Sequence, residues 1–226
     1  MASEKIRLSG KEIYELLSSV ISISSNDFAP LFAKKLNAGP FSVLVSIILT
    51  QNTTERNALK AFKNLFEATK LNPQRVLSLG IWELSKIIRV AGLPMQKSGA
   101  ILRLSSYVIE KGEEHLLSED PAKLREELIS IPGIGEKTAD VFLSLYRKYS
   151  VFPVDTHIKR IAIRWGLVDK KSSYKEISSI LLDFFGPSIS DKAHRLMIAF
   201  GRTYCRSKDP RCWECPLKKV CPHAQI

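Results

Sequence analysis

The sequence of 226 residues lacks the features that mark disordered, fibrous or membrane-spanning proteins. It has no low-complexity tract and only 11 glycines and 11 prolines, and its 45% hydrophobic and 25% charged residues are typical of a globular protein. Its longest apolar run, Phe41 to Leu49, is far shorter than the ~20 residues that span a bilayer. The first residues lack the apolar core of a signal peptide. We therefore expect a cytoplasmic protein without a membrane partner.

Strand-like alternation, internal repeats and flexible Gly/Ser linkers are also missing. Apolar residues instead recur at helical spacing, for example at Ile101, Leu104 and Val108, and Ser9 to Glu12 forms a capping-box pattern. Three prolines stand where one helix should give way to the next: Pro73, Pro121 and Pro187. The sequence predicts an all-α protein of about ten short helices, whose domain boundary is packed rather than linker-like.

The charge balance is strongly positive, because 34 Lys and Arg outnumber 23 Asp and Glu and give a net charge of +11. Such a surplus favours a polyanionic partner, with nucleic acid the first candidate. Many basic proteins bind no nucleic acid, so charge by itself does not decide the function.

Cysteine is absent until the last 22 residues, where Cys205, Cys212, Cys215 and Cys221 follow the spacing Cys-x6-Cys-x2-Cys-x5-Cys. Four thiolates this close can converge on one metal centre, whereas disulfides are rare in the cytosol outside hyperthermophiles. Structural zinc sites usually have two short Cys pairs, and only one is present, so the spacing favours a four-iron cluster over zinc. Nearby lysines and arginines make this loop positive, and its task is either electrostatic or simply to hold the C-terminus.

The segment 124–142 predicts two helices joined by a tight turn, Pro-Gly-Ile-Gly. Gly133 and Gly135 can take positive φ and leave the backbone bare, so N–H groups at the start of the second helix can face an anion. A DNA phosphate fits such a nest. The alternative is an ordinary helix–helix turn that contains glycine.

Lys137 lies in the first turn of that second predicted helix, beside an apolar stripe that includes Ile134 and Val141. The helix N-terminus and the apolar surroundings disfavour an ammonium, as an amine nucleophile requires. A solvated surface lysine is the common alternative, so this interpretation needs a partner.

A candidate partner is Asp155, in the turn Phe152-Pro-Val-Asp-Thr-His157 before another predicted helix. Asp155 or Thr156 would ordinarily be a helix N-cap. A carboxylate at a helix start is held ionised, which suits capping or the stabilisation of a developing positive charge. His157 could be catalytic, although a histidine bonded to a nearby backbone group is the commoner case.

Together these motifs closely resemble the endonuclease III family of helix-hairpin-helix DNA glycosylases in base excision repair. The resemblance is carried by residues 131–139 (IPGIGEKTA), by Val154-Asp-Thr-His157, by the cysteine tail and by Gln51-Asn-Thr-Thr54. They occur in the family's order and cover most of the chain.

The resemblance implies two helical domains that bind double-stranded DNA, damaged or abasic, across the cleft between them. One is a six-helix barrel at 32–149, with the helix-hairpin-helix at about 124–142. The other combines 1–31 with 150–226 and carries a [4Fe-4S] cluster in the loop 205–221. We expect a monomer, associated with the nucleoid of a prokaryotic cell.

By motif position, the resemblance assigns Lys137 as the nucleophile and Asp155 as the catalytic carboxylate. Gln51 and Leu93 fall where the family inserts side chains into the gap left by a flipped base. The remaining expected DNA contacts are Gly133, Ile134, Gly135, Lys218 and Lys219.

Two positions bear on the substrate. Adenine-removing relatives have a catalytic Glu where this chain has Ile47, and they lack the lysine; thymine-mismatch relatives commonly have Tyr at the position of Lys137. We therefore predict a bifunctional glycosylase/lyase acting on oxidised pyrimidines. The alternatives are a T:G or U:G mismatch glycosylase of the same superfamily, or a non-catalytic DNA-binding protein with a Cys₄ zinc site.

Overall fold

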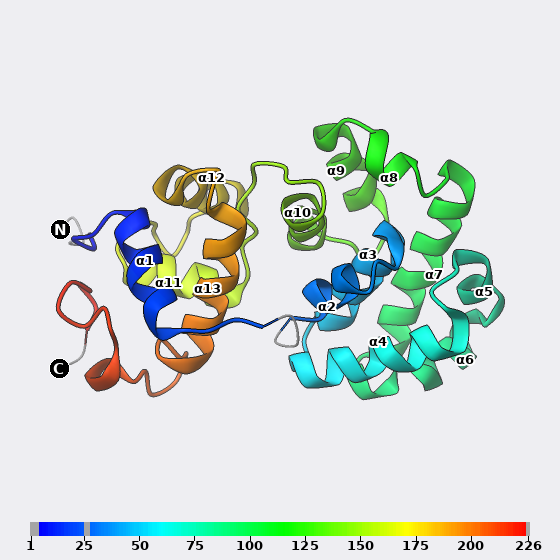
Figure 1. Ribbon diagram of the computed structural model, residues 1–226, viewed down its shortest axis with the longest axis horizontal. Coiled ribbons are helices and arrows are strands. Elements are labelled where there is room, and N and C mark those ends of the chain that lie inside the picture. Colours follow the sequence, from blue (N-terminus) through cyan, green and yellow to red (C-terminus); the bar gives the residue numbers. More distant parts are fainter. Residues whose placement is uncertain (1–4, 25–27, 225–226) are drawn as a thin grey trace. The chain divides into compact units, whose positions relative to one another are not determined.

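The computed structural model describes residues 5–24 and 28–224. Within these residues there are thirteen α-helices and no strand, so the all-α prediction is confirmed (Figure 1). The expected number of about ten was too low, because helices as short as α8 (His115–Ser118) leave little periodic signal in the sequence. None of the described helices combines the length and apolar composition needed to cross a bilayer.

The chain divides into two compact units, which are described separately. Unit 1 comprises residues 1–23 and 148–226, and unit 2 comprises residues 24–147. The sequence placed the corresponding limits at 31/32 and 149/150.

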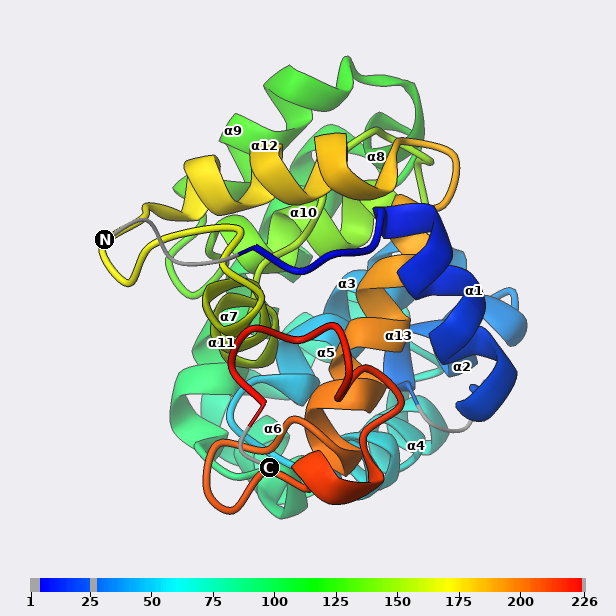
Figure 2. The same ribbon diagram turned by 90° about the vertical axis from the view of Figure 1, so that its left-hand side faces the viewer.

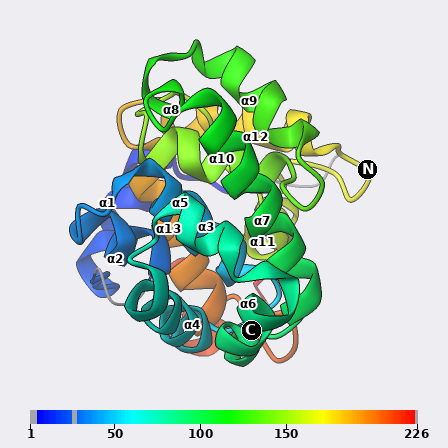
Figure 3. The ribbon, with the colours of Figure 1, turned by 90° about the vertical axis from the view of Figure 1, so that its right-hand side faces the viewer.

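Unit 2 is built around α3 (Gly39–Thr50), in which every residue from Pro40 to Leu49 is buried. A helix that is apolar all round must be covered on all sides, and α3 contacts helices from both ends of the unit (Figure 3). Its neighbours include α2 (Ala29–Lys35), α4 (Glu55–Thr69), α7 (Pro94–Lys111), α8 and α10 (Glu136–Leu145). The remaining elements are α5 (Pro73–Ser78), α6 (Gly80–Ile87), the 3₁₀ helix η2 (Arg89–Ala91) and α9 (Pro121–Ser130).

Unit 1 packs α1 (Gly10–Val20) beside α13 (Ser190–Thr203), together with α11 (Thr156–Arg164) and α12 (Tyr174–Phe185) (Figure 2). The capping box predicted at Ser9 to Glu12 is present, and Ser173 forms another at the start of α12. Gly10 sits so close to α12 that a Cβ there would lie 2.1 Å from the Phe184 carbonyl oxygen. Trp165, fully buried, packs on Phe200 of α13 with ring centroids 6.0 Å apart.

The predicted helix breaks at proline also hold. Pro73 and Pro121 are the first residues of α5 and α9, where the missing N–H costs no helical hydrogen bond, and Pro187 lies between α12 and α13. After α13 the chain contains only the short 3₁₀ helix η3 (Cys212–Glu214) among the described residues.

Candidate functional site

The turn between α9 and α10 is the helix-hairpin-helix expected from the sequence. Gly133 has φ +100°, and a Cβ there would lie 2.6 Å from the Cβ of Ala100, so both conformation and space require glycine. Gly135 is different: it has φ −98°, and it caps α10 with no side-chain hydrogen bond. Gly135 is exposed, and the first backbone N–H groups of α10 therefore have no side-chain acceptor at this end of the helix.

Two side chains from other elements hold this turn in place. The Gln51 amide, at the end of α3, donates from Nε2 to the Gly133 carbonyl and to the Thr138 hydroxyl, each at 3.2 Å. Arg103 of α7 donates from Nε to the Pro132 carbonyl at 2.9 Å. The structure thus brings the predicted DNA-contacting residues Gln51 and Gly133 together, 82 positions apart in the chain.

Lys137 is the second residue of α10 and is half-buried. Asp140 and Glu136, its acidic neighbours on α10, bond to a different cation. Arg125 of α9 donates to Asp140 at 2.6 and 3.2 Å and to Glu136 at 3.3 Å. These bonds raise the pKa of Arg125, the Asp140 hydrogen bond most. The Lys137 ammonium makes no hydrogen bond or ion pair with any of the described residues, and is left available to an outside group.

Leu93 is 43% exposed and has φ +49°, directly after Gly92 at φ +72°. It is the N-cap of α7 and offers no side-chain cap hydrogen bond. Two features of Leu93 are unfavourable. Its backbone has a positive φ, which strains a residue with a side chain, and its apolar side chain contacts water. Such a residue is a candidate for contact with something outside the chain.

Asp155 belongs to unit 1, whereas Lys137 belongs to unit 2. The Asp155 carboxylate is half-buried and caps α11, where Oδ1 accepts a hydrogen bond from the Ile158 N–H at 2.8 Å. His157 lies 3.0 Å from Arg160, Nδ1 to Nη2, and its pKa is lowered chiefly by burial. Its ring nitrogen is thus engaged by a side chain of its own helix rather than presented as a free base.

The four cysteines line one pocket, together with apolar residues that include Phe200 and Leu217. None of the four forms a disulfide. Burial, with a smaller contribution from the three neighbouring thiols, raises the pKa of Cys215 to about 11. Four sulfur donors crowded in a partly apolar pocket fit a thiolate-ligated centre, because a bound cation compensates the charge that these thiols would otherwise avoid.

Two arginines of α11 hold the first cysteine. Arg160 donates to the Cys205 carbonyl from Nε at 3.1 Å and from Nη2 at 2.9 Å, and Nη2 also reaches the Gly201 carbonyl. Arg164 donates from Nη1 to the Cys205 sulfur at 3.2 Å and to the Arg206 carbonyl at 2.7 Å. The start of the cysteine loop is therefore anchored to a regular helix.

Lys218 and Lys219 are both exposed in the same loop. The Lys218 ammonium donates to the Trp213 carbonyl at 3.2 Å, so this side chain also braces the loop.

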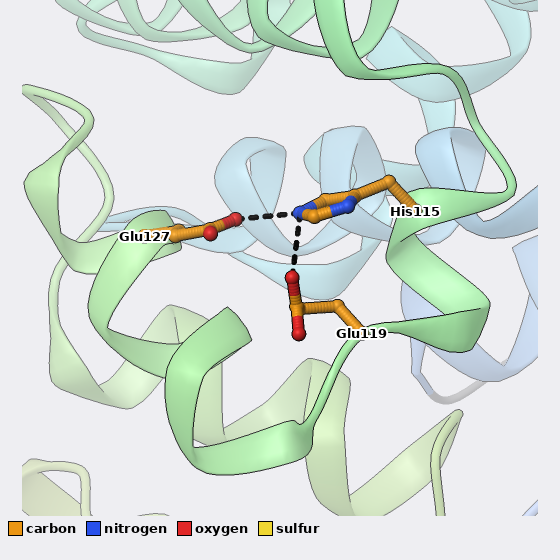
Figure 4. A group of neighbouring side chains, drawn as sticks. All are labelled: His115, Glu119 and Glu127. Carbon is orange, nitrogen blue, oxygen red and sulfur yellow. Dashed lines mark hydrogen bonds and ion pairs between the residues drawn. The ribbon is translucent and has the colours of Figure 1, made fainter.

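His115, Glu119 and Glu127 form a second cluster of potential metal ligands, shown in Figure 4. Their oxygens and nitrogen already have partners: Glu127 Oε2 lies 2.6 Å from His115 Nε2 and accepts from the Tyr107 hydroxyl, and Glu119 accepts from Lys123 at 2.8 Å. These contacts lower the pKa of both glutamates. The cluster is satisfied internally and ties α7, α8 and α9 to one another.

Three cations of unit 2 with structural roles were not predicted from the sequence: Arg103, Arg125 and Lys97. Lys97 is 2% exposed, and its ammonium donates to the carbonyls of Leu49 and Ala91. It shares the helical spacing of Ile101 and Leu104, so the apolar periodicity could have placed it on the buried face of α7. No local signal pointed to the partners of the two arginines.

Known proteins resemble the chain over most of its length. Residues 45–187 match the family model described as HhH-GPD superfamily base excision DNA repair protein. An endonuclease III of Sulfolobus acidocaldarius is 32% identical over 213 residues, which are 94% of this chain and 95% of that protein. An endonuclease III of Thermotoga maritima is 35% identical over 182 residues, 80% of this chain and 82% of that protein.

Solved structures agree with these matches. An endonuclease III trapped as a covalent intermediate with DNA has a TM-score of 0.75 at 27% identity, and the match covers 96% of this chain and 97% of that one. A thermostable thymine-DNA glycosylase has a TM-score of 0.73 at 18% identity, covering 95% and 96% of the two chains, which is a likeness of fold alone.

Proposed function

Because this chain belongs to the HhH-GPD superfamily of base excision DNA repair proteins, we propose that it is a bifunctional DNA glycosylase and abasic-site lyase of the endonuclease III type. Its substrate is double-stranded DNA that carries an oxidised pyrimidine or an abasic site. The proposal rests mainly on the surroundings of Lys137. Its amine has no partner among the described residues, and it is the second residue of α10, the helix that follows the hairpin turn and has no side-chain cap. A monomer located in the cytoplasm with the nucleoid remains the prediction from sequence.

The hairpin supplies the grip on DNA in this proposal. Exposed N–H groups at the start of α10 face an oxygen of the phosphate backbone, which the positive end of the helix dipole also attracts. Gly133 and Gly135 form this contact with their backbone, whereas the Ile134 N–H already donates to the Ile131 carbonyl at 2.9 Å and is not available to the phosphate. The bonds from Gln51 and Arg103 keep the turn in shape before DNA arrives.

Damaged nucleotides must leave the stack before they react, at a cost of a few kcal/mol that is smallest for weakly stacked bases. Gln51 and Leu93 fill the gap that the nucleotide leaves. The exposure of Leu93 and its left-handed backbone support this role, since neither favours the isolated protein.

Lys137 and Asp155 carry the chemistry. Asp155 stabilises positive charge on the deoxyribose and takes part in deprotonating Lys137, whose neutral amine attacks C1′. The glycosidic bond breaks and the base leaves with the bonding electrons. Opening of the sugar ring gives a Schiff base, loss of the C2′ proton follows, and the C3′–O bond to the phosphate breaks in a β-elimination that nicks the strand.

Oxidised pyrimidines are the proposed substrate class because a saturated ring is non-planar and stacks poorly. Removal of adenine calls for an acid that protonates the base. Ile47 stands where adenine-removing relatives have their catalytic glutamate. Its side chain is a buried hydrocarbon in α3 and cannot act as an acid.

We further propose that Cys205, Cys212, Cys215 and Cys221 hold a [4Fe-4S] cluster. Their convergence on one pocket supports this, and the pattern of one short pair favours it over zinc. When bound, the cluster supplies four metal–thiolate bonds that order residues 205–221. The loop then presents Lys218 and Lys219 to the DNA backbone.

Borohydride trapping on abasic DNA tests the lyase. Lys137→Gln keeps most of the side-chain bulk but no nucleophile, so we expect no covalent adduct while DNA binding persists. Lys111→Gln, which alters an exposed lysine at the end of α7, is the matched control and should trap normally. Full trapping by Lys137→Gln would end the assignment. An absence of trapping by the wild type would exclude the lyase and leave a mismatch glycosylase or a purely binding protein as the alternatives.

A panel of duplexes tests the substrate class. We expect nicking of DNA with thymine glycol or an abasic site, and little action on adenine opposite 8-oxoguanine or thymine opposite guanine. Efficient removal of mispaired thymine would instead identify a mismatch glycosylase of the same superfamily.

A further inference from the structure

Lys97 is a buried cation for which the proposed chemistry has no use. Only 2% of the residue is exposed, and burial lowers its pKa to about 8. Its ammonium donates to the Leu49 carbonyl at 2.9 Å and to the Ala91 carbonyl at 2.7 Å. No carboxylate among the described residues forms an ion pair with it, so two carbonyl dipoles compensate its lost hydration.

The two carbonyls belong to the segments that carry the two proposed gap-filling side chains. Leu49 lies two residues before Gln51 at the end of α3, and Ala91 lies two residues before Leu93 at the end of η2. Through these bonds one ammonium joins the ends of two elements that are otherwise about 40 residues apart in sequence. The backbone N–H of Lys97 also donates to the Leu93 carbonyl at 3.1 Å.

Lys97 therefore brackets the stretch Ala91-Gly92-Leu93 from both sides: its side chain holds the first carbonyl and its main chain holds the last. Within this stretch both Gly92 and Leu93 have positive φ. A left-handed leucine persists only where surrounding contacts over-determine the backbone. The bonds from Lys97 are contacts of that kind.

A buried ammonium is an expensive way to fill this space. An apolar side chain of similar volume avoids the desolvation penalty, and such replacements of buried charges are often neutral or stabilising. What an apolar residue cannot do is fix two backbone carbonyls at one point. The buried charge thus lowers stability but fixes the positions of two backbone carbonyls.

We propose that Lys97 is a positioning residue that sets the separation and orientation of Gln51 and Leu93, so that both enter the duplex together when a nucleotide is flipped. The inference rests on the proposed function of those two side chains. It adds that the pair acts as one unit, whose rigidity comes from Lys97 rather than from packing alone.

The test uses Lys97→Met, which keeps the length of the side chain and removes all its donors. If Gln51 and Leu93 lose their mutual position, single-turnover excision of thymine glycol should fall roughly ten- to a hundredfold. Trapping at a ready-made abasic site, where no base has to leave the stack, should change by less than about threefold. Lys111→Met on the same helix is the matched control, and Lys97→Arg, which keeps the charge and several donors, should restore most of the excision rate.

A direct readout is the fluorescence of 2-aminopurine placed opposite the lesion, which rises when that base is unstacked. We expect a smaller rise with Lys97→Met at saturating protein. In a Leu93→Ala background the further effect of Lys97→Met should shrink to about twofold or less, because residues that act as a unit are not additive. A full-size effect in that background, or equal losses on thymine glycol and abasic DNA, would overturn the proposal.

If Lys97→Met fails to fold, Lys97→Gln is measured in its place; its shorter amide reaches one carbonyl at most, so the same selective loss is expected. If the wild type forms no adduct with abasic DNA, the proposed lyase fails, yet the 2-aminopurine signal, which needs no bond cleavage, still decides on Lys97.

Discussion

The hairpin region of unit 2 and the cysteine loop of unit 1 gather their functional groups in opposite ways. Around the hairpin, four cationic or amide side chains, Gln51, Lys97, Arg103 and Arg125, bond to backbone or carboxylate groups of neighbouring helices. The loop 205–221 has one short 3₁₀ helix and four cysteines in a shared pocket. The first region is organised by contacts within the chain, and the second gathers the four cysteines that are proposed to hold a cluster.

The two regions should therefore differ in how much they depend on the proposed cluster. Packing and hydrogen bonds already fix the backbone that is to grip DNA, so the hairpin should keep its shape without iron. The loop is anchored at its start by Arg160 and Arg164, and within it by the bond from Lys218 to Trp213. We therefore expect perturbations of one region to leave the other nearly unchanged.

The largest effect is expected from Cys212→Ser. Loss of one thiolate should remove the cluster's visible absorption and expose residues 205–221 to protease, because ligation supplies the order of that loop. Iron content, absorption and limited proteolysis measure this, with Ser207→Ala as a control in the same loop. Iron at full stoichiometry in Cys212→Ser would contradict the ligand assignment, and cleavage at the hairpin would break the separation between the regions.

Next in size is Arg125→Met, which removes the ion pair between Arg125 and the fully buried Asp140. Removing one member of a buried pair should lower the free energy of unfolding by about 3 kcal/mol, since the other charge stays buried. Urea denaturation checks this against Arg75→Met, an exposed arginine on α5. Equal stability of the two variants would mean that the pair contributes nothing to the hairpin.

The lowered pKa of the buried Lys97 should make the stability of the protein depend on pH. Its pKa is about 8 in the folded protein and near the ordinary value for lysine in the unfolded chain. Between these values the unfolded chain binds the proton that the folded protein has lost, so stability rises with pH. Relative to Lys97→Met, the wild type should become more stable by about 3 kcal/mol from about pH 8 to about pH 10.5.

Below about pH 8 the lysine is protonated in both states, and the difference between the wild type and Lys97→Met should be flat. Chemical denaturation at several pH values gives both parts of the curve. A difference that stays flat at higher pH as well would show that burial does not disfavour this ammonium.

The smallest effect concerns the surface of the loop. Replacing Lys218 and Lys219 with alanine should flatten the salt dependence of DNA affinity, with the log–log slope reduced by about 0.9 for each phosphate that the protein no longer neutralises. Binding titrations at several salt concentrations measure the slope. Replacement of Lys11 on α1 serves as the control. An unchanged slope would place both lysines away from DNA.

Much of this could be predicted from sequence because the signals are local. Ser9 and Asp155 cap helices as their residue types indicate, Pro121 opens a helix, and the spacing of Cys205 to Cys221 brought four thiols to one pocket. Helical periodicity predicted the all-α class, and the family resemblance, confirmed by the matches to known proteins, added the activity.

The remainder depends on contacts between distant parts of the chain. The bond from Gln51 to Gly133 spans 82 residues and that from Lys97 to Leu49 spans 48, and no local rule selects such partners. Gly135 shows a further limit: its residue type suggested positive φ, but only Gly133 of the two takes it. A glycine permits that conformation without requiring it.

The central claim is that the amine of Lys137 bonds to the sugar of the damaged nucleotide. Its most direct test is to reduce the wild-type protein with borohydride on abasic DNA, digest the adduct with protease and nuclease, and locate the modified residue by mass spectrometry. We expect a single attachment at Lys137. Attachment at Lys97, at another lysine or at the N-terminal amine, with Lys137 unmodified, would contradict it.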